Sequence, residues 1–291
     1  MQDLRQYLRE GNFIIADGAT GTVLQSMGLQ PSTAPELWNV EKPEAIRSLH
    51  RAYLDAGSQV ILTNTFGGNR IRLNRAGGLG KRIEELNRAA VLLAKEEADG
   101  RTYVAGDIGP TGELMAPYGS LSYEVAVDVF AQQARFLAEG GVDLIWIETM
   151  SDLNEAKAAI KGTKRVTDLP IFCSLSFGRR GRTMMGTTPT QAIETLWPLG
   201  LTAIGGNCGE GVEVMIPVLT EMRNAFADAV LIAKPNAGLP RLENGRTVFD
   251  MRPEDMATHA RHFLKLGAQV IGACCGSSPA HIAAITEALR A

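Results

Sequence analysis

Three of the four cysteines lie where two apolar runs end in glycine-rich turns. Cys208 closes the run 203–208, and Cys274 and Cys275 follow the run 268–271 and precede Gly276. Barrel and doubly wound enzymes place their chemistry at the carboxyl ends of buried strands. Three thiolates on one zinc ion leave its fourth tetrahedral position open, as in catalytic zinc sites. We therefore interpret Cys208, Cys274 and Cys275 as ligands of one zinc ion.

The same cysteines have structural interpretations. Free cysteine is common in protein cores, and adjacent cysteines can form a vicinal disulfide, although the chain has no secretory features. Neighbours in a strand point to opposite faces, so Cys274 and Cys275 can share a metal only if the backbone bends there, as Gly276 allows. Cys173 lies inside the apolar run 171–175. We predict that Cys173 belongs to the core and binds no metal.

Composition limits the classes of function. Of 291 residues, 45% are hydrophobic and 21% charged, and the formal net charge is -3. These values support a large core and favour neither nucleic-acid nor membrane-surface binding. Residues 1–6 lack the apolar stretch of a signal peptide, and no apolar run approaches the ~20 residues of a membrane span. We expect a cytoplasmic protein, in a compartment that keeps thiols reduced.

Eight short apolar runs alternate with amphipathic segments. Runs that are apolar throughout are typical of parallel strands covered on both faces, and apolar residues three and four apart predict helices. The runs lie at 13–16, 59–62, 103–106, 144–147, 171–175, 203–208, 230–233 and 268–271, and the helical segments at 45–54, 83–98, 125–139, 153–164, 192–199, 212–226, 253–266 and 279–289. Eight repeats predict a single (β/α)8 TIM-type barrel over residues 1–291. A doubly wound sheet is the alternative, but the glycine-rich stretch 106–112 lacks its G-x-G-x-x-G fingerprint.

Polar residues collect at the predicted strand ends, which a barrel would gather around one mouth. Besides the cysteines they are Asp17, Thr63, Asn64, Asp107, Glu148 and Asn236. Carboxylates beside thiolates suit a metal ion and a small cationic or zwitterionic ligand. Asp17 and Asn236 could instead form turns, Glu148 could cap a helix, and Asp107 could be structural. The histidines lie on predicted helices, so we assign no chemistry to His50, His259, His262 and His281.

Seven segments together resemble a known family. They are 17–22 (DGATGT), 62–67 (LTNTFG), 106–112 (GDIGPTG), 148–149 (ET), 206–208 (GNC), 235–238 (PNAG) and 274–276 (CCG). Over almost its whole length the chain resembles the zinc-dependent homocysteine S-methyltransferases, especially the homocysteine-binding barrel of cobalamin-dependent methionine synthase. The resemblance implies an enzyme that activates homocysteine, or a related small thiol, as a zinc-bound thiolate and methylates it. Its zinc ligands match Cys208, Cys274 and Cys275.

The resemblance also implies positions for the amino-acid part of the substrate. The family holds its substrate near positions that match Asp17, Gly18, Ala19, Thr63 and Glu148, and Asn236 matches a position near the metal. We expect Glu148 and Asp17 to hold the substrate ammonium during catalysis, and the backbone N–H groups of Gly18 and Ala19 to hold its carboxylate.

The methyl donor is the least determined part of this prediction. Gly67 replaces a tyrosine of the betaine-using members, which disfavours betaine, and we expect the protein to have no folate or cobalamin module of its own. We expect methylcobalamin on a separate corrinoid protein, or else S-methylmethionine, with the loops 67–75 and 110–118 shaping that choice and offering few bulky side chains. A zinc-dependent demethylase that passes a methyl group to a corrinoid protein is the alternative function. A non-catalytic zinc-binding barrel is a third.

Overall fold

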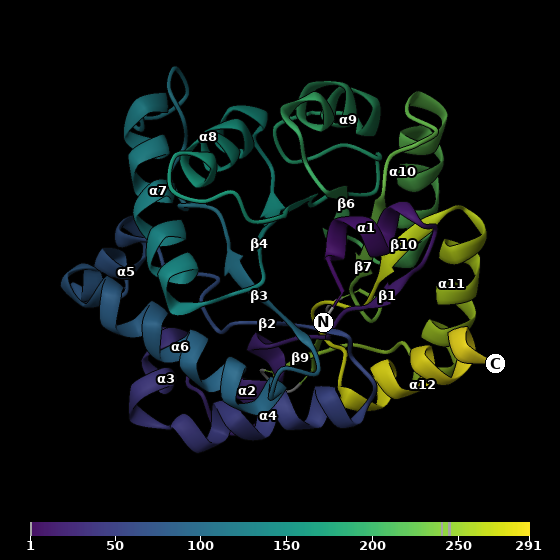
Figure 1. Ribbon diagram of the computed structural model, residues 1–291, viewed down its shortest axis with the longest axis horizontal. Coiled ribbons are helices and arrows are strands. Elements are labelled where there is room, and N and C mark those ends of the chain that lie inside the picture. Colours follow the sequence, from purple (N-terminus) through teal and green to yellow (C-terminus); the bar gives the residue numbers. More distant parts are fainter. Residues whose placement is uncertain (1, 240, 244–245) are drawn as a thin grey trace.

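The computed structural model describes residues 2–239, 241–243 and 246–291, and its centre is a barrel of eight parallel strands (Figure 1). The strands are β1 (Ile14–Ile15), β2 (Val60–Leu62), β3 (Tyr103–Ile108), β4 (Leu144–Met150), β5 (Ile171–Leu175), β6 (Ala203–Cys208), β7 (Leu231–Pro235) and β10 (Ala268–Ile271). Each overlaps one of the predicted apolar runs. The (β/α)8 barrel expected from the sequence is therefore confirmed.

The two ends of the sheet meet at a seam between β1 and β2. The strand order is β1-β10-β7-β6-β5-β4-β3-β2, and the isolated bridge between Ala16 and Val60 joins its ends. Side chains supplement this short pairing, since Gln59 Oε1 accepts the Ile15 N–H at 3.1 Å and Asp17 Oδ2 accepts the Leu62 N–H at 2.7 Å. A residue predicted to bind substrate thus also helps to close the barrel.

Helices cover the outside of the barrel, and each predicted helical segment corresponds to one of them (Figure 1). They are α4 (Pro43–Asp55), α6 (Ile83–Ala98), α7 (Tyr123–Gly140), α8 (Leu153–Lys164), α9 (Pro189–Leu196), α10 (Val212–Ala225), α11 (Pro253–Lys265) and α12 (Pro279–Arg290). Local capping explains several starts. Asp152 accepts backbone N–H groups at the start of α8, and Thr188 with Gln191 forms a capping box on α9.

Large apolar side chains fill the interior of the barrel. Trp146 and Phe172 meet there edge to face, with ring centroids 5.2 Å apart. Helix α1 (Leu4–Arg9), which the sequence analysis did not predict, adds Leu4 and Leu8 to this cluster and lies across the amino-terminal end of the barrel (Figure 1). The interior is therefore a packed core, and ligand space lies at the opposite end.

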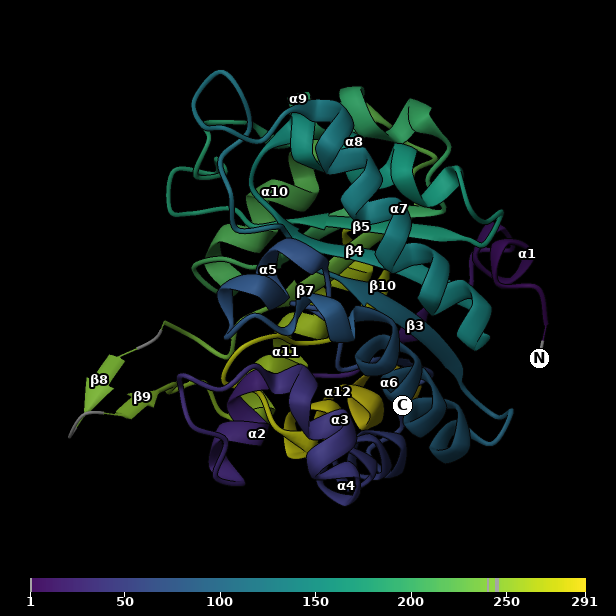
Figure 2. The same cartoon turned by 90° about the vertical axis from the view of Figure 1, so that its left-hand side faces the viewer.

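Short unpredicted elements build up the carboxyl-terminal end. They are α2 (Gly21–Ser26), α3 (Trp38–Glu41), α5 (Arg70–Arg75) and the hairpin of β8 (Arg241–Glu243) and β9 (Arg246–Val248). In Figure 2 this hairpin projects on the side opposite α1. The connections after β1 and β2 are long, as predicted, and α2, α3 and α5 form within them.

Candidate functional site

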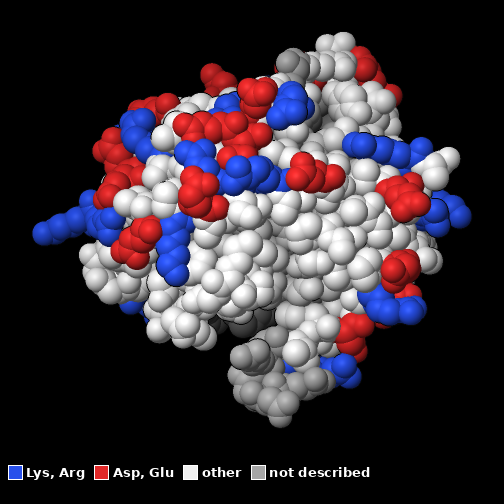
Figure 3. Space-filling view, turned by 90° about the horizontal axis from the view of Figure 1, so that it is seen from below, with Lys and Arg blue, Asp and Glu red and all other residues white. Residues whose placement is uncertain are grey.

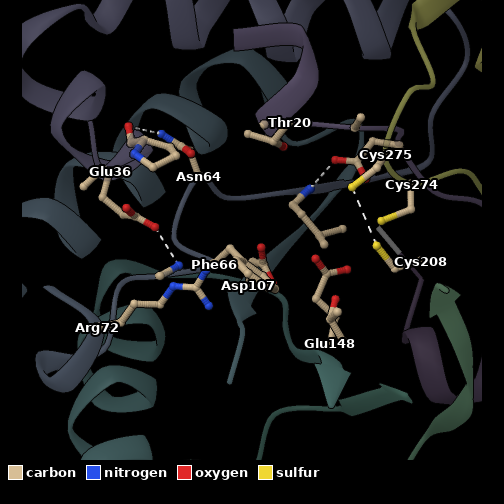
Figure 4. Close-up of a pocket in the computed structure, with 18 of the residues that line it drawn as sticks. Thr20, Glu36, Asn64, Phe66, Arg72, Asp107, Glu148, Cys208, Cys274 and Cys275 are labelled. Atoms are coloured by element: carbon tan, nitrogen blue, oxygen red, sulfur yellow. Dashed lines mark hydrogen bonds between the residues drawn. The ribbon is translucent and has the colours of Figure 1, made fainter. Parts of the chain in front are cut away.

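A cavity of about 370 Å³ opens at the carboxyl ends of the strands. Figure 4 shows the three cysteines Cys208, Cys274 and Cys275 at one end and Glu36, Phe66 and Arg72 at the other. Asp107 and Glu148 lie between the two ends. Its volume is near the lower limit for small-molecule pockets, and thiols and carboxylates share its wall.

The three cysteines converge as a metal site requires. Their Sγ atoms all lie within 4.8 Å of one another, and those of Cys208 and Cys275 are 3.6 Å apart. A tetrahedral site with zinc–sulfur bonds of 2.3 Å separates its sulfur atoms by roughly 3.8 Å. Among the described residues, no other group of three or more His, Cys, Asp or Glu side chains comes together in this way. Number, spacing and donor chemistry therefore fit a zinc ion with one open position.

The backbone after β10 explains how adjacent cysteines face the same space. Cys274 and Cys275 lie beyond the end of the strand, so strand alternation does not apply to them. The Cys274 N–H donates to the Pro235 carbonyl at 2.8 Å, and the Cys275 carbonyl accepts the Ala237 N–H at 2.9 Å. Gly276 has a φ of 81°, in the left-handed region that favours glycine. The loop after β7 thus fixes the bend that this pair of ligands requires.

Asn207, the residue before Cys208, is fully buried behind the site and has a supporting role that the sequence did not predict. Its Oδ1 accepts the Thr149 N–H at 2.8 Å, and its Nδ2 donates to Thr149 Oγ1 at 2.7 Å. Thr149 and Cys208 both have a positive φ, 61° and 58°, which is uncommon for residues with a side chain. The reciprocal bonds hold the ends of β4 and β6 in these conformations and so position Cys208.

Cys173 is outside the site, as its neighbours in the sequence suggested. It is fully buried in the core between the barrel and the helices. Burial raises the pKa of its thiol to about 12, so it stays protonated. Its role as a core residue is confirmed.

Lys234 is the main residue that sequence reasoning missed. It is 2% exposed, lines the cavity from β7, and donates from Nζ to Asp17 Oδ1 at 2.9 Å. Burial alone would lower the pKa of Lys234, but attraction from Asp17 and Glu148 outweighs it and raises that pKa. The ammonium therefore remains charged. A lysine next to the apolar run 230–233 was the available sign, because charged side chains are rarely buried without a partner.

Both carboxylate oxygens of Asp17 therefore already accept hydrogen bonds from the protein, which the sequence did not predict. Its Oδ1 accepts from Lys234 and its Oδ2 from the Leu62 N–H. Burial raises the pKa of Asp17, while Lys234 and the Leu62 hydrogen bond oppose that rise. Its predicted role in holding the substrate ammonium stays a prediction, in competition with a partner already in place.

Two other carboxylates have oxygen atoms without partners. Asp107 Oδ1 and Glu148 Oε2 are buried, and neither has a hydrogen-bond partner among the described residues. Burial raises the pKa of both carboxyl groups. The charge of Glu148 raises the pKa of Asp107 further, whereas the charge of Lys234 opposes the increase in the pKa of Glu148. Unpaired buried acceptors are costly, so the site is complementary to a ligand that donates hydrogen bonds and carries positive charge.

The remaining predicted residues divide into two groups. Gly18 and Ala19 line the cavity, although the Ala19 N–H already donates to Ser277 Oγ at 3.0 Å. Thr63 and Asn236 are not among the lining residues. Thr63 Oγ1 bonds Thr65 Oγ1 and accepts the Asp107 N–H, and Asn236 Nδ2 donates to the Gly209 carbonyl. Thr63 therefore supports Asp107 of the wall, and Asn236 supports the turn that follows Cys208. Their predicted contact with substrate is untested.

The far end of the cavity is more crowded than the sequence suggested. The Arg72 guanidinium lies 4.8 Å from the centroid of the Phe66 ring, and Glu36 Oε1 accepts the Gly67 N–H at 2.6 Å. The loop after β2 therefore does line the cavity, as predicted, but with bulky side chains. None of the residues 110–118 is part of the wall.

Residues predicted to have no chemistry lie elsewhere. His50, His259, His262 and His281 are on α4, α11 and α12, and none lines the cavity. No helix within the described residues is long and apolar enough to cross a membrane.

Solved structures support the fold. The metallated form of the homocysteine methyltransferase MmuM from Escherichia coli superposes with a TM-score of 0.82 and 24% identity, covering 100% of both chains. The oxidised form of that enzyme gives 0.80 and 24% over 99% of each chain. At this identity the likeness establishes the shared barrel.

Sequence comparison establishes the family. The methionine synthases of Mycobacterium tuberculosis and Mycobacterium leprae are each 30% identical to this chain over 95% of its length. The chain spans about a quarter of the length of those proteins, since the match covers 24% of each. The profile of one family, homocysteine S-methyltransferase, matches residues 14–289. The chain therefore belongs to the homocysteine S-methyltransferase family.

Proposed function

We propose that this protein is a zinc-dependent methyltransferase that methylates the sulfur of homocysteine or a closely related small thiol. One observation carries the proposal: three converging cysteine thiols share a cavity with two buried carboxylates that have unpaired oxygen atoms. The thiols suit a metal that binds sulfur, and the carboxylates suit the ammonium of an amino acid. Family membership points to the same substrate.

Cys208, Cys274 and Cys275 would hold the zinc ion. Bound there, zinc supplies the charge that deprotonates a thiol whose ordinary pKa is near 8.5 and keeps its sulfur nucleophilic at neutral pH. The three thiols are only half-buried and face the cavity, so a ligand sulfur can approach them. Asn207 and the loop after β7 fix the directions of the thiols before any ligand arrives.

The substrate ammonium would lie between Glu148 and Asp107. Each offers a buried oxygen that lacks a hydrogen-bond partner within the described residues. A cation placed there relieves the repulsion between these carboxylates and satisfies both oxygens. This assignment retains Glu148 from the sequence analysis and adds Asp107. Asp17 would contribute mainly through its ion pair.

Methyl transfer requires the donor to approach the sulfur in line. The sulfur lone pair forms the new S–CH3 bond while the bond between the methyl carbon and the donor breaks, and its electron pair leaves with the donor. The cavity extends from the cysteines towards Phe66 and Arg72, so the donor would enter from that end (Figure 4).

Two donors remain in the proposal. A free S-methylmethionine suits the small volume of the cavity. Methylcobalamin on a separate corrinoid protein would have to dock over the mouth, and the loops after β3 and β5 expose the side chains of Tyr118 (75%) and Met184 (81%). Charged residues gather along the upper part of the face in Figure 3, and the surface around its lower hollow carries few. We retain the corrinoid protein as the first choice because the exposed side chains of Tyr118 and Met184 suit a docking partner.

The test is a screen of donors and thiols with zinc-loaded protein. We expect methionine to form from homocysteine with methylcobalamin, or with S-methylmethionine if the choice of donor is wrong. Cys208→Ser should abolish the reaction with either donor, and Cys173→Ser should not. Demethylation of a methylated substrate with no reaction of homocysteine would favour the corrinoid-dependent demethylase. Zinc binding without any methyl transfer would favour the non-catalytic barrel.

A further inference from the structure

The loop between β5 and α9, residues 176–188, carries positive charge at the carboxyl-terminal end of the barrel, on the side opposite α1 (Figure 2). It holds Arg179, Arg180 and Arg182 within four residues, and all three are exposed. Arg179 pairs with Glu210 at 2.6 Å, whereas Arg182 donates only to a backbone carbonyl of its own loop. The side chain of Arg180 has no ion pair or hydrogen bond among the described residues. Two positive charges therefore face solvent unneutralised, in a chain whose formal net charge is -3.

Two consecutive turns give this loop a defined shape. In the first turn the Gly178 N–H donates to the Arg182 carbonyl at 2.9 Å, and in the second the Thr183 N–H donates to the Thr187 carbonyl at 2.9 Å. Met184 lies within the second turn and is 81% exposed. A loop that is already ordered loses less conformational entropy on binding than a flexible one. The arginines and the methionine are thus presented together before any partner arrives.

The loop is attached to the turn that follows Cys208, the proposed zinc ligand. Gly209 has a φ of 67°, and a Cβ on it would lie 2.3 Å from the Phe177 carbonyl oxygen, so the two loops are in close contact. The ion pair between Arg179 and Glu210 joins the same two loops. A partner that binds residues 176–188 is consequently held beside the cysteine end of the cavity.

The composition of the loop indicates the class of partner. Arginine and methionine are enriched at protein–protein interfaces relative to the rest of the surface. No residue of 178–188 lines the cavity of the site, so the exposed arginines do not enclose a small anion there. Single-stranded nucleic acid would need exposed aromatic rings for its bases, but Phe177, the aromatic residue of this loop, is 3% exposed. An acidic protein surface therefore fits the loop best.

We propose that residues 176–188 dock an acidic surface of a partner protein. Arg180 and Arg182 would pair with its carboxylates, and Met184 would contact an apolar side chain between them. The inference rests on the proposed function, because the partner that needs a place at this mouth is the protein that carries the methyl donor. The competing view is that the arginines are only a solvated part of the surface.

Binding of a fluorescein-labelled hexaglutamate peptide separates these views, measured by fluorescence anisotropy with the zinc-loaded full chain at low ionic strength. The double variant Arg180→Glu with Arg182→Glu should weaken binding by about tenfold or more, and added salt should reduce the difference. Replacing both arginines with lysine keeps the charge and should retain most of the binding. A second peptide, with a leucine between two triplets of glutamate, should bind more tightly than hexaglutamate to the parent protein but not to Met184→Ser.

The matched control makes the same change in net charge at the other end of the barrel. Arg9 ends α1 and Arg101 lies just before β3, and both are exposed. The double variant Arg9→Glu with Arg101→Glu should bind hexaglutamate as the parent does. Equal weakening in both double variants would show that the peptide senses only net charge, which overturns the inference. Tighter binding of a hexauridylate RNA than of either peptide would overturn it as well.

The proposed function is tested separately in the same proteins. Methylation of homocysteine by free methylcobalamin should be equal in the parent and in Arg180→Glu with Arg182→Glu, because this donor needs no docking surface. Loss of that reaction in the double variant would place the arginines in the site itself and refute their docking role. A parent protein that binds the peptides through this loop but methylates no thiol with any donor refutes the proposed function, and the docking surface stands without it.

Discussion

The buried pair of Asp17 and Lys234 leads to a quantitative prediction about stability. Their side chains are 2% and 3% exposed and 2.9 Å apart. Removing one partner of such a pair leaves an uncompensated buried charge and costs ~3–5 kcal/mol, whereas replacing both removes the need for compensation. We expect Lys234→Met and Asp17→Asn each to lower the free energy of unfolding by this amount. The double variant should lie much closer to the parent protein than the sum of the two losses.

The size of the effect makes it measurable by thermal unfolding. With an unfolding entropy of ~2.1 cal/mol/K per residue, a chain of 291 residues loses about 1.6 °C of melting temperature per kcal/mol. Each single variant should therefore melt about 5–8 °C below the parent when all proteins carry equal zinc. The assay is differential scanning calorimetry at pH 7 on the parent, both single variants and the double variant.

An exposed ion pair provides the control. Arg252 and Asp255 are 3.0 Å apart, with side chains that are 73% and 47% exposed. Arg252→Met should lower the melting temperature far less than Lys234→Met, because solvent screens such pairs. If Lys234→Met costs no more than Arg252→Met, or if the losses of the two single variants simply add, the buried pair is not coupled and the reasoning fails.

Three further predictions concern the metal, the substrate and pH. Cys208→Ser should lose the bound zinc and Cys173→Ser should keep about one ion per chain, as elemental analysis will show; the opposite pattern would exclude the proposed ligands. Glu148→Gln should keep zinc but bind homocysteine more weakly by roughly 1.5–3 kcal/mol in calorimetric titration, and unchanged affinity would contradict its role. Burial lowers the pKa of His50 from 6.5 to about 4. As the pH falls, His50 is protonated in the unfolded chain at a higher pH than in the folded protein. The free energy of unfolding therefore decreases as the pH drops from 6.5 towards 4, by ~2 kcal/mol at pH 5. His50→Leu should remove that loss from urea unfolding curves, and an equal pH dependence in both proteins would refute it.

The architecture was predictable because it follows from local periodicity. Apolar runs of four to six residues gave all eight barrel strands, and amphipathic spacing gave the bounds of α6 and α8. The cysteines could also be placed, since strand ends of a parallel barrel converge. Helix α1 was missed because Leu4 and Leu8 form a short amphipathic pattern whose burial depends on the open end of a barrel made by distant segments.

The details of the site depend on contacts that no local pattern contains. Lys234 was overlooked because its partner, Asp17, is 217 residues away in the chain. The family resemblance assigns Thr63 to the substrate, and this stays a prediction; the sequence could not show that its hydroxyl bonds Thr65 and accepts the Asp107 N–H. Whether a polar side chain at a strand end faces the cavity or supports its wall depends on the neighbouring strand. That information exists only in the folded chain.

The hydrogen bond between Leu62 and Asp17 joins the cavity to the closure of the barrel. β1 contributes only two residues to the sheet, so this side-chain acceptor continues its pairing with β2 beyond the end of the strand. Local separation of β1 from β2 would break this bond and displace the partner of Lys234 while the other strands stay paired. The Leu62 amide hydrogen exchanges with solvent only during such openings, so its deuterium uptake measures how often β1 and β2 separate. The cavity therefore stays assembled only as long as β1, the shortest strand of the barrel, remains paired with β2.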